Sequence, residues 1–418
     1  MTDADAGGGR EGGDGNGSET GGGGDRGPLA GLNVVELTVH RAGPFCGALL
    51  ADLGAEVVKI ERPGVGDPTR VQGVGPEGRS GYFMANNRNK QSIELDLKSE
   101  AGREVARELV GKADVFVENM GYGVADRLGL GYDDLSERNP DLVYASVKGY
   151  GETGPLREKK GMDLILQAEG GIMSVTGPEG GDPVKVGQAI GDLTAGMFAT
   201  IGVLARLQEV AAGLGGGKLD VGLFDAVVSM MNEYLTFYSM DGQVPGPQGT
   251  SHQSMVPYQL FETADGYVVT AVPADDRWDD FVDVVGCESV REYGTNAERV
   301  DHEEEVVTAI EAELLEEPTD HWLEVLEAGG FPVGPLNDVA DVAGHEQAEA
   351  RGLVPRFDDP DAGEIVLPGH PVNFPDHSTA IRTLPPSLGE HTEAVLRSLG
   401  HDDESIARLR EAGAIPEE

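Results

Sequence analysis

Strands and helices alternate along the first half of the chain, and this order constrains the fold more than any other feature. The run LNVVELT at 32–38 is typical of a buried strand, GPFCGALLADLG at 43–54 of a helix, and EVVKIE at 56–61 of a second strand. Such a strand–helix–strand unit is parallel and right-handed. The same pattern predicts further strands and helices at 91–97, 99–113, 114–119, 142–151, 194–208 and 225–240. We therefore expect an α/β fold with a mostly parallel sheet.

The loop after the first strand, TVHRAGP at 38–44, lies where parallel sheets of this kind bind ligands. It lacks the GxGxxG spacing of dinucleotide-binding folds, so NAD is not expected. The chain also has no HExxH or CxxC metal motif, no GxSxG nucleophile elbow and no Walker loop. The usual catalytic motifs are absent, and carboxylates in unusual settings remain as candidates.

The 418 residues exceed the size at which one hydrophobic core usually stops growing, so at least two domains are expected. The N-terminal stretch is rich in Gly and Asp and is predicted to be disordered. After a turn-rich stretch at 241–254, a hairpin is predicted at 258–272, and acidic helices follow. We divide the chain into a disordered tail, a large α/β domain, a smaller domain and a final acidic region, at 1–27, 28–224, 225–330 and 331–418.

Acidic residues outnumber basic ones by 74 to 31, which gives a net charge of −43. Self-repulsion at this density destabilises a fold unless salt screens it, and the simplest explanation is the cytoplasm of a halophile. The charge argues against nucleic acid and against an anionic membrane as partners.

The chain has two cysteines, too few for a disulfide framework, which fits a reducing cytosol. Cys46 is either a nucleophile or, as we favour, a small residue that packs a helix. We expect no stretch that is long and apolar enough to span a bilayer, and the N-terminus has no hydrophobic signal core. These features predict a soluble cytoplasmic protein.

One segment departs from the general acidity. Residues 58–160 contain 16 basic residues and 17 acids, so this quarter of the chain is nearly neutral. Two explanations remain open at this point: a site for a polyanionic ligand, or ordinary ion pairs on helix faces.

Asp192 stands between a glycine and a long apolar run, in GDLTAGMFATIGVLARLQ at 191–208. By position it is a helix N-cap whose side chain accepts a hydrogen bond from the N–H of Thr194 or Ala195. The same helix end offers a positive dipole and spare N–H donors, which can hold an anionic intermediate. Asp163 precedes a second apolar run and is open to the same interpretations. The residues alone do not decide between capping and catalysis.

Six blocks of the sequence have a spacing like that of a known enzyme family. They are AGPFCGALLADLGAEVVKIERPGVGDPTR, NNRNKQSIELDLKS, ADVFVENMGYGVADRLGLGYDDL, NPDLVYASVKGYGETGP, GDLTAGMFATIGVLARL and SLGEHTEAVLRSLG. From about residue 29 to the C-terminus the chain resembles the class III CoA-transferases, which include formyl-CoA transferase, carnitine-CoA transferase and 2-methylacyl-CoA racemase. The resemblance implies a large domain built from both chain ends, a small domain between them, and an interlocked homodimer.

The resemblance also implies that Asp192 is the catalytic nucleophile, with Asp163 as an auxiliary acid. The Asp192 carboxylate would attack a thioester, pass through a mixed anhydride and an aspartyl-CoA thioester, and deliver CoA to a second acid. Backbone amides near Asp192 are expected to stabilise the oxyanions. Because one thioester is exchanged for another, CoA is a substrate, and no metal, ATP or tightly bound cofactor is expected. The implied CoA contacts lie at or near Arg62, Lys90, Asn119, Met120, Arg127, Leu128 and Lys160.

Two departures from the family pattern bear on the reaction type. Racemases of the family have a histidine directly before the acid at position 163, whereas this chain has Met162, which cannot transfer a proton. Formyl-CoA transferases have a glutamine where this chain has Arg41, and a glycine loop where it has TSHQSMVPYQ at 250–259. CoA transfer is therefore favoured, and oxalate is not expected as the substrate.

The guanidinium of Arg41 either holds the distal carboxylate of a dicarboxylic acid, with His40 and His252 assisting, or pairs with a nearby acid. If Arg41 faces the substrate, succinyl-CoA is the expected donor and a C4–C5 dicarboxylate such as mesaconate the acceptor. Two alternatives remain: a 2-methylacyl-CoA racemase, and a non-catalytic CoA-binding protein in which Asp192 only caps its helix.

Overall fold

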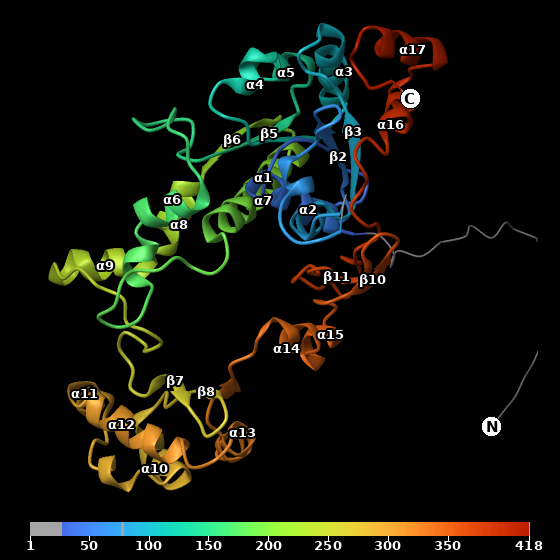
Figure 1. The fold of residues 1–418 in the computed structure, drawn as a ribbon. Coiled ribbons are helices and arrows are strands. Elements are labelled where there is room, and N and C mark those ends of the chain that lie inside the picture. The colour runs from blue at the N-terminus through green and yellow to red at the C-terminus, as the bar shows by residue number, and fades with distance from the viewer. Residues whose placement is uncertain (1–26, 77–78, 418) are drawn as a thin grey trace, which may run out of the picture.

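The computed structural model describes residues 27–76 and 79–417, and these form two units that each have their own sheet and core (Figure 1). The tail predicted to be disordered, 1–27, lies outside the described residues except for Gly27. The larger unit contains a six-stranded sheet, and the second unit a three-stranded sheet.

All six strands of the larger sheet are parallel, which confirms the predicted α/β fold. Their order is β3-β2-β1-β4-β5-β6, so the direction in which strands are added reverses between β1 and β4. In sheets of this order, ligands bind beyond the carboxyl ends of the strands at that reversal. The strands are β1 (Asn33–Leu37), β2 (Glu56–Glu61), β3 (Lys90–Glu94), β4 (Val115–Glu118), β5 (Val143–Lys148) and β6 (Gly217–Gly222).

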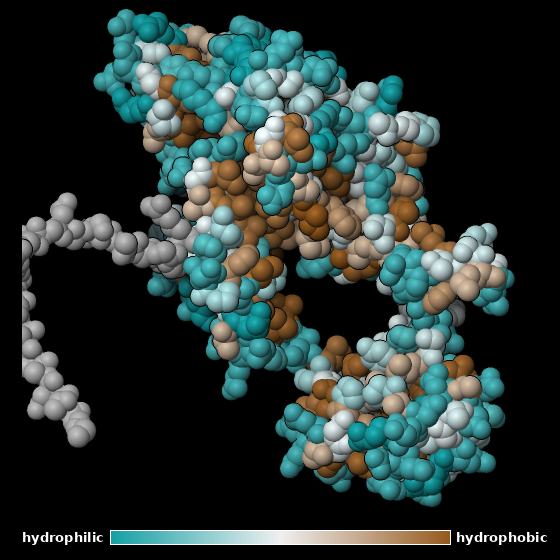
Figure 2. Space-filling view, turned by 180° about the vertical axis from the view of Figure 1, so that it is seen from behind, coloured by the Kyte–Doolittle hydropathy of each residue, from teal (hydrophilic) through white to brown (hydrophobic). Residues whose placement is uncertain are grey.

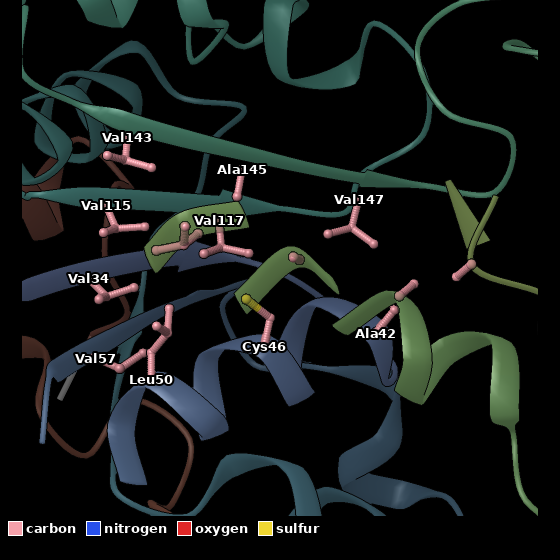
Figure 3. Packing of buried hydrophobic residues seen from close by; sticks show 14 of the residues in the cluster. Val34, Ala42, Cys46, Leu50, Val57, Val115, Val117, Val143, Ala145 and Val147 are labelled. Carbon is pink, nitrogen blue, oxygen red and sulfur yellow. The ribbon is translucent and has the colours of Figure 1, made fainter. Parts of the chain in front are cut away.

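Apolar side chains point to both faces of this sheet, because helices cover both. Val34 belongs to one buried cluster and its neighbour Val35 to the other, as the alternation of a strand requires. Figure 3 shows the first cluster, in which strand valines face Cys46 and Leu50 of α1. This face is covered by α1 (Ala42–Asp52), α7 (Ile190–Ala211) and α8 (Leu223–Met230), the other by α3 (Glu100–Gly111), α5 (Tyr132–Arg138), α16 (Thr392–Leu399) and α17 (Asp403–Glu411).

Cys46 is a packing residue. Its side chain is fully buried in the first cluster, and burial raises the pKa of the thiol to about 12. A thiol in that state is a poor nucleophile, so the packing interpretation holds.

Helices α1 and α7 approach each other closely where Gly196 lies against the first turn of α1. A Cβ atom at Gly196 would lie 2.8 Å from the carbonyl oxygen of Ala42, which leaves no room for a side chain. This contact brings the N-terminal end of α7 close to the loop that follows β1. The other helices of this unit are α2 (Gly81–Asn87), α4 (Val124–Arg127), α6 (Asp163–Glu169), α9 (Asn232–Asp241) and the 3₁₀ turns η1 (Pro68–Val71) and η2 (Ile172–Val175).

Helix α7 is the one helix of the described residues that is long and apolar enough to cross a membrane, by length and composition. The expectation that no stretch reaches this length was therefore wrong. Ala195, Ala199 and Val203 of α7 are nevertheless buried in the core beneath the parallel sheet.

The second unit begins later in the chain than predicted. Leu223 and Ala226 of α8 belong to the core of the larger unit, whereas the separate core of the second unit starts at Val256. The boundary placed at 225 therefore falls inside α8. The predicted hairpin is present as the antiparallel strands β7 and β8. The elements are β7 (Tyr258–Glu262), β8 (Tyr267–Ala271), β9 (Val333–Pro335), η3 (Asp275–Arg277), η4 (Glu288–Val290), α10 (Trp278–Val285), α11 (Asn296–Asp301), α12 (Glu303–Leu314) and α13 (Thr319–Ala328).

After β9 the chain returns to the larger unit. Val395, Leu396 and Ile406 of the last helices join the second core cluster of the parallel sheet. The returning segment and the α9 segment run on opposite sides of an opening between the two units (Figure 1), and the space-filling view shows this opening bordered by hydrophobic side chains (Figure 2). The returning segment contains α14 (Val339–Ala343), α15 (Glu346–Ala350), β10 (Arg356–Asp359) and β11 (Gly363–Val366).

Candidate active site

The loop after β1 is held by side chains that come from the neighbouring strands. Lys59 of β2 donates from Nζ to the carbonyl oxygen of Thr38 at 2.7 Å. Asn119, directly after β4, accepts from the N–H of Val39 at 2.8 Å and donates to its carbonyl oxygen at 2.7 Å. Both sides of the reversal in strand order are thus tied to this loop, and its backbone cannot shift without losing buried hydrogen bonds.

The next residue of the loop, His40, has a φ of 65°, a left-handed conformation that is uncommon outside glycine. Asp67 accepts a hydrogen bond from the His40 N–H at 3.2 Å and also caps η1 through the N–H of Thr69 at 2.9 Å. These hydrogen bonds fix the backbone at His40, and the following residue, Arg41, reaches Gln188 in the segment before α7. The imidazole of His40 is exposed.

A buried ion cluster lies beneath the loop. Lys59 Nζ is 3.3 Å from Glu36 and 3.2 Å from Asp67, and Lys90 Nζ is 2.9 Å from Glu36. All four side chains are fully shielded from solvent, and burial lowers the pKa of Lys90 to about 8. Lys90 thus supports the sheet rather than the surface of a binding site, which corrects the expectation that it contacts CoA.

Arg41 has an unusual set of neighbours for an arginine in so acidic a chain. Its Nη1 donates to Oε1 of Gln188 at 3.3 Å, and its guanidinium carbon lies 4.4 Å from the ring centre of Tyr82. Its Nε is buried without a hydrogen-bond partner in the described structure. Among residues 27–76 and 79–417, no carboxylate lies within 4.0 Å of it. The alternative in which Arg41 pairs with a nearby acid is therefore not what the structure contains.

Asp192 is the third residue of α7 and lies half-buried at its N-terminal end. Burial, together with the negative charge of Asp163, raises its pKa to about 6, while the charge of Arg41 acts in the opposite direction. Within the described residues no group donates a hydrogen bond to its carboxylate. The carboxylate is thus available for chemistry.

Asp163, the first residue of α6, performs the capping that the sequence assigned to Asp192. Its Oδ1 accepts from the N–H groups of Gly191 at 2.8 Å and Asp192 at 3.3 Å. The expectation that Asp192 caps the helix through Thr194 or Ala195 was wrong. These two N–H groups are also already used, so they are not free to stabilise an oxyanion.

Gln167 connects this cap to the segment before α7. It is fully buried, donates to Oδ2 of Asp163 at 2.6 Å, and accepts from the N–H of Val186 at 2.9 Å. It also donates to the carbonyl oxygen of Gln188 at 3.3 Å. One amide side chain therefore fixes both Asp163 and the backbone that carries Gln188.

A cavity of about 220 Å³ lies beyond the carboxyl ends of β1 to β4, at the reversal in strand order. Three of the residues expected to contact CoA, Arg62, Met120 and Leu128, line it. Arg127 is exposed directly beside Leu128, and Lys160 is exposed on a loop. Asn119 lies next to Met120, but its amide is used to hold Val39.

Some of the cationic side chains without an ion pair line this cavity or lie beside the Asp192 site. In a chain with 74 acids to 31 bases, most described Lys and Arg residues have a carboxylate partner. Lys98 and Arg62, both lining the cavity, have none. Those of residues 27–76 and 79–417 without a carboxylate within 4.0 Å are Arg41, Arg62, Lys98, Arg127, Lys160, Lys185, Arg351 and Arg382. A phosphate-rich ligand would find free charges here.

His252 is not brought to Asp192 within one chain. Its ring stacks on Tyr258 of β7 at 5.0 Å, and its backbone N–H donates to the carbonyl oxygen of the same residue. It therefore belongs with the second unit, across the opening from the parallel sheet (Figure 1).

Sequence reasoning missed several residues of the site. Tyr82, Gln167 and Gln188 lie in segments without a catalytic motif, and only the fold brings them to Asp192 and Arg41. Lys98 could have been found, because it follows the third predicted strand at the edge where ligands bind.

Comparison with known proteins agrees with this geometry. A family model described as CoA-transferase family III matches residues 29–392. The chain belongs to CoA-transferase family III. A human succinyl-CoA:glutarate CoA-transferase is 37% identical over 395 residues, covering 93% of this chain and 90% of the human protein. A succinyl-CoA:mesaconate CoA-transferase of Haloarcula marismortui is 36% identical and covers 90% of this chain and 97% of the relative.

A solved structure of known fold is similar to this family III CoA-transferase. A CAIB/BAIF family protein from Brucella suis superposes with a TM-score of 0.81 at 35% identity, covering 90% of this chain and 100% of that protein. As a CoA-transferase, the chain uses CoA thioesters as substrates.

Proposed function

We propose that this CoA-transferase moves CoA from succinyl-CoA to a C4–C5 dicarboxylate such as mesaconate or glutarate, with Asp192 as the nucleophile. The observation that carries the proposal is the pair formed by Asp192 and Arg41. A carboxylate that accepts no hydrogen bond lies near a guanidinium that has no carboxylate partner within the described residues. Relatives named for succinyl-CoA and for glutarate or mesaconate support the choice of substrates.

In the first half of the reaction, an oxygen of Asp192 attacks the thioester carbonyl of the donor. The C–S bond breaks, CoA leaves as a thiolate, and a mixed anhydride forms between the donor acid and Asp192. The thiolate then attacks the Asp192 carbonyl of the anhydride. This releases the donor acid as its carboxylate and leaves CoA as a thioester on Asp192.

The second half runs the same steps with the acceptor. Its carboxylate attacks the aspartyl thioester, which releases CoA thiolate and forms a new anhydride. The thiolate attacks the acceptor carbonyl of that anhydride, which gives the product thioester and restores the Asp192 carboxylate. Every step moves an acyl group between oxygen and sulfur, so no net proton or electron is consumed.

Arg41 selects the substrate by holding the carboxylate that does not react. A guanidinium donates to a carboxylate in a bidentate manner, and the Tyr82 ring, 4.4 Å from the guanidinium carbon, supports the Arg41 side chain. The CoA phosphates meet Arg62, Lys98, Arg127 and Lys160, whose charges are free of ion pairs in the described structure.

The test is a panel of CoA esters and carboxylic acids, read by mass spectrometry, combined with trapping by hydroxylamine. Incubation with succinyl-CoA should convert Asp192 to a hydroxamate, and Asp192→Ala should remain unmodified while still binding CoA. Arg41→Gln should raise the KM for dicarboxylates more than for monocarboxylates of equal length, with Arg41→Lys intermediate. Modification at another residue, or an equal effect on both acid classes, would contradict the proposal.

We propose further that two chains interlock as a homodimer. In each chain, the second unit is inserted in the sequence between the two parts of the larger unit. In support, α7 exposes apolar side chains, including Ile201 at 60% and Phe198 at 39%, and hydrophobic side chains border the opening of the single chain (Figure 2). Light scattering should give twice the chain mass for the wild type, and Ile201→Glu should shift it toward the monomer. A wild-type monomer would contradict the dimer.

We also propose a cytoplasmic location in a halophile, supported by the net charge of −43 and by the similarity to a Haloarcula protein. Small-molecule substrates are then the partners, since a surface this acidic repels nucleic acids and anionic lipids. Fractionation of the source cells and measurement of their internal KCl would test this.

A further inference from the structure

The side chain of Arg41 is held in place without being neutralised. Its Nη1 donates to the amide oxygen of Gln188 at a long 3.3 Å, and its guanidinium carbon lies 4.4 Å from the centre of the Tyr82 ring. A carboxylate in the same place would hold the guanidinium more strongly, but it would also occupy the donors that a substrate needs. A neutral amide orients Arg41 and leaves its charge unmatched.

Gln188 combines a fixed backbone with a movable side chain. Its carbonyl oxygen accepts from the N–H of Ile190 at 2.9 Å and from the buried amide of Gln167 at 3.3 Å. Its side chain is exposed, and within the described residues its contact with Arg41 is its one hydrogen bond. The amide can therefore swing away by side-chain rotation alone, without moving the N-terminal end of α7.

Gln188 lies just before α7, on the side of the helix end where the proposed function places the substrate. Gln188 comes four residues before Asp192, at the same end of α7, and Arg41 acts on the charge of Asp192. A dicarboxylate with one carboxylate at Asp192 would then bring its second carboxylate to the guanidinium whose Nη1 donates to Gln188 in the free enzyme.

We propose that Gln188 is a positioning residue that acts as a displaceable, neutral stand-in for the distal carboxylate of the acceptor on Arg41. The proposal rests on the proposed function, because it needs a dicarboxylate at Arg41. Displacement exchanges a hydrogen bond from the guanidinium to a neutral amide oxygen for one to a carboxylate, in which both partners are charged. Monocarboxylates make no such exchange, so Gln188 sets the preference between the two classes of acid.

Gln188→Glu tests this, because it installs a permanent carboxylate partner for Arg41. The KM for a C5 dicarboxylate should rise about tenfold or more relative to a C5 monocarboxylate, as a lost or blocked charge-assisted contact implies. The added charge also acts on Asp192, but this effect is common to both acids and cancels in the ratio of their KM values. Gln347→Glu, the same change on exposed α15, should leave the ratio unchanged.

A double-mutant cycle shows whether Gln188 acts through Arg41. In an Arg41→Gln background, Gln188→Glu should no longer change the ratio of KM values. If Gln188→Glu leaves the ratio unchanged in the wild-type background, or changes it equally without Arg41, the inference is wrong. The proposed function fails separately, when the wild type shows no preference for dicarboxylates or hydroxylamine does not label Asp192.

Discussion

Asp192 lies in a place that is unfavourable for its own charge. Burial and the neighbouring carboxylate of Asp163 both raise its pKa, to about 6, and Arg41 only partly offsets them. A carboxylate with a raised pKa is more basic than an ordinary one, so it is a better nucleophile while it remains ionised at neutral pH. Asp163 caps this end of α7, so the carboxylate of Asp192 does not have that role.

The raised pKa predicts the pH dependence of transfer. In the proposed mechanism the ionised carboxylate attacks, so kcat/KM should be flat above pH 7 and fall about tenfold per pH unit below the pKa of about 6. Rates measured from pH 4.5 to 8 with one donor and one acceptor give this profile. A flat profile down to pH 5 would contradict the assignment of the nucleophile.

Asp163→Asn should move this acidic limb to lower pH, because the charge of Asp163 contributes to the raised pKa of Asp192. The variant should also cost about 1–3 kcal/mol of stability, since an amide NH₂ would face the donating NH₂ of Gln167 at 2.6 Å. The pH profile and urea unfolding of the same sample measure both effects. An unchanged acidic limb would show that Asp163 does not influence the nucleophile.

Asp192→Asn should abolish transfer and stabilise the fold at neutral pH. An acid whose folded pKa is raised gains stability from its bound proton below its unfolded pKa and loses it as the pH rises through about 6. At pH 7 the wild type therefore carries a penalty that the amide lacks, about 1–2 kcal/mol after allowance for partial exposure. Urea unfolding at pH 7 and at pH 4 should show the gain at pH 7 and little difference at pH 4.

At the scale of elements, the site depends on how closely α1 approaches α7. Gly196 is the contact point, where an added Cβ would lie 2.8 Å from the backbone oxygen of Ala42 and 3.0 Å from the ring of Phe45. Backbone atoms cannot move aside as a flexible side chain does. This contact sets the separation between the loop that carries Arg41 and the helix that carries Asp192.

Gly196→Ala should therefore destabilise the protein by about 1–3 kcal/mol, as overpacking of a core does, and lower kcat by shifting α7 from the loop. Gly111→Ala provides the control, because that glycine ends α3 with nothing within 4 Å of an added Cβ. It should leave activity unchanged and be neutral or stabilising by up to about 1 kcal/mol. Thermal unfolding and kcat of both variants decide between the two outcomes.

Four charged side chains are buried together beneath the loop after β1. Glu36, Lys59, Lys90 and Asp67 satisfy one another, and their hydrogen bonds hold the loop after β1. Removing one partner from such a group leaves a buried charge without compensation, which costs more than the group contributes. These residues are therefore structural, although they lie directly beneath the site.

For the whole molecule, the net charge of −43 predicts a strong dependence of stability on salt. Raising KCl from about 0.1 M to 1 M shortens the screening length from about 10 Å to about 3 Å, so repulsion between surface carboxylates falls. The unfolding temperature should rise across this range. Equal stability in dilute buffer would contradict the halophilic assignment.

The sequence by itself determined the α/β class and the family. Strand periodicity of two and helix periodicity of 3.6 are local properties, and the family motifs are contiguous blocks, so both can be read from neighbouring residues. Asp192 was identified as an acid at the start of an apolar run, and Arg41 as a departure from the family pattern. The family resemblance implied Arg62, Met120 and Leu128 as CoA contacts, and all three line one cavity.

Only the tertiary structure decided the roles of these residues. Asp163 lies 28 residues before Gly191, yet it caps α7 and leaves Asp192 free. Lys90 is a cation within one of the blocks that resemble the family, but the fold buries it against Glu36. Whether a charge is a ligand contact, a cap or a nucleophile depends on what surrounds it in space, and burial and partnership are set by elements far apart in the chain.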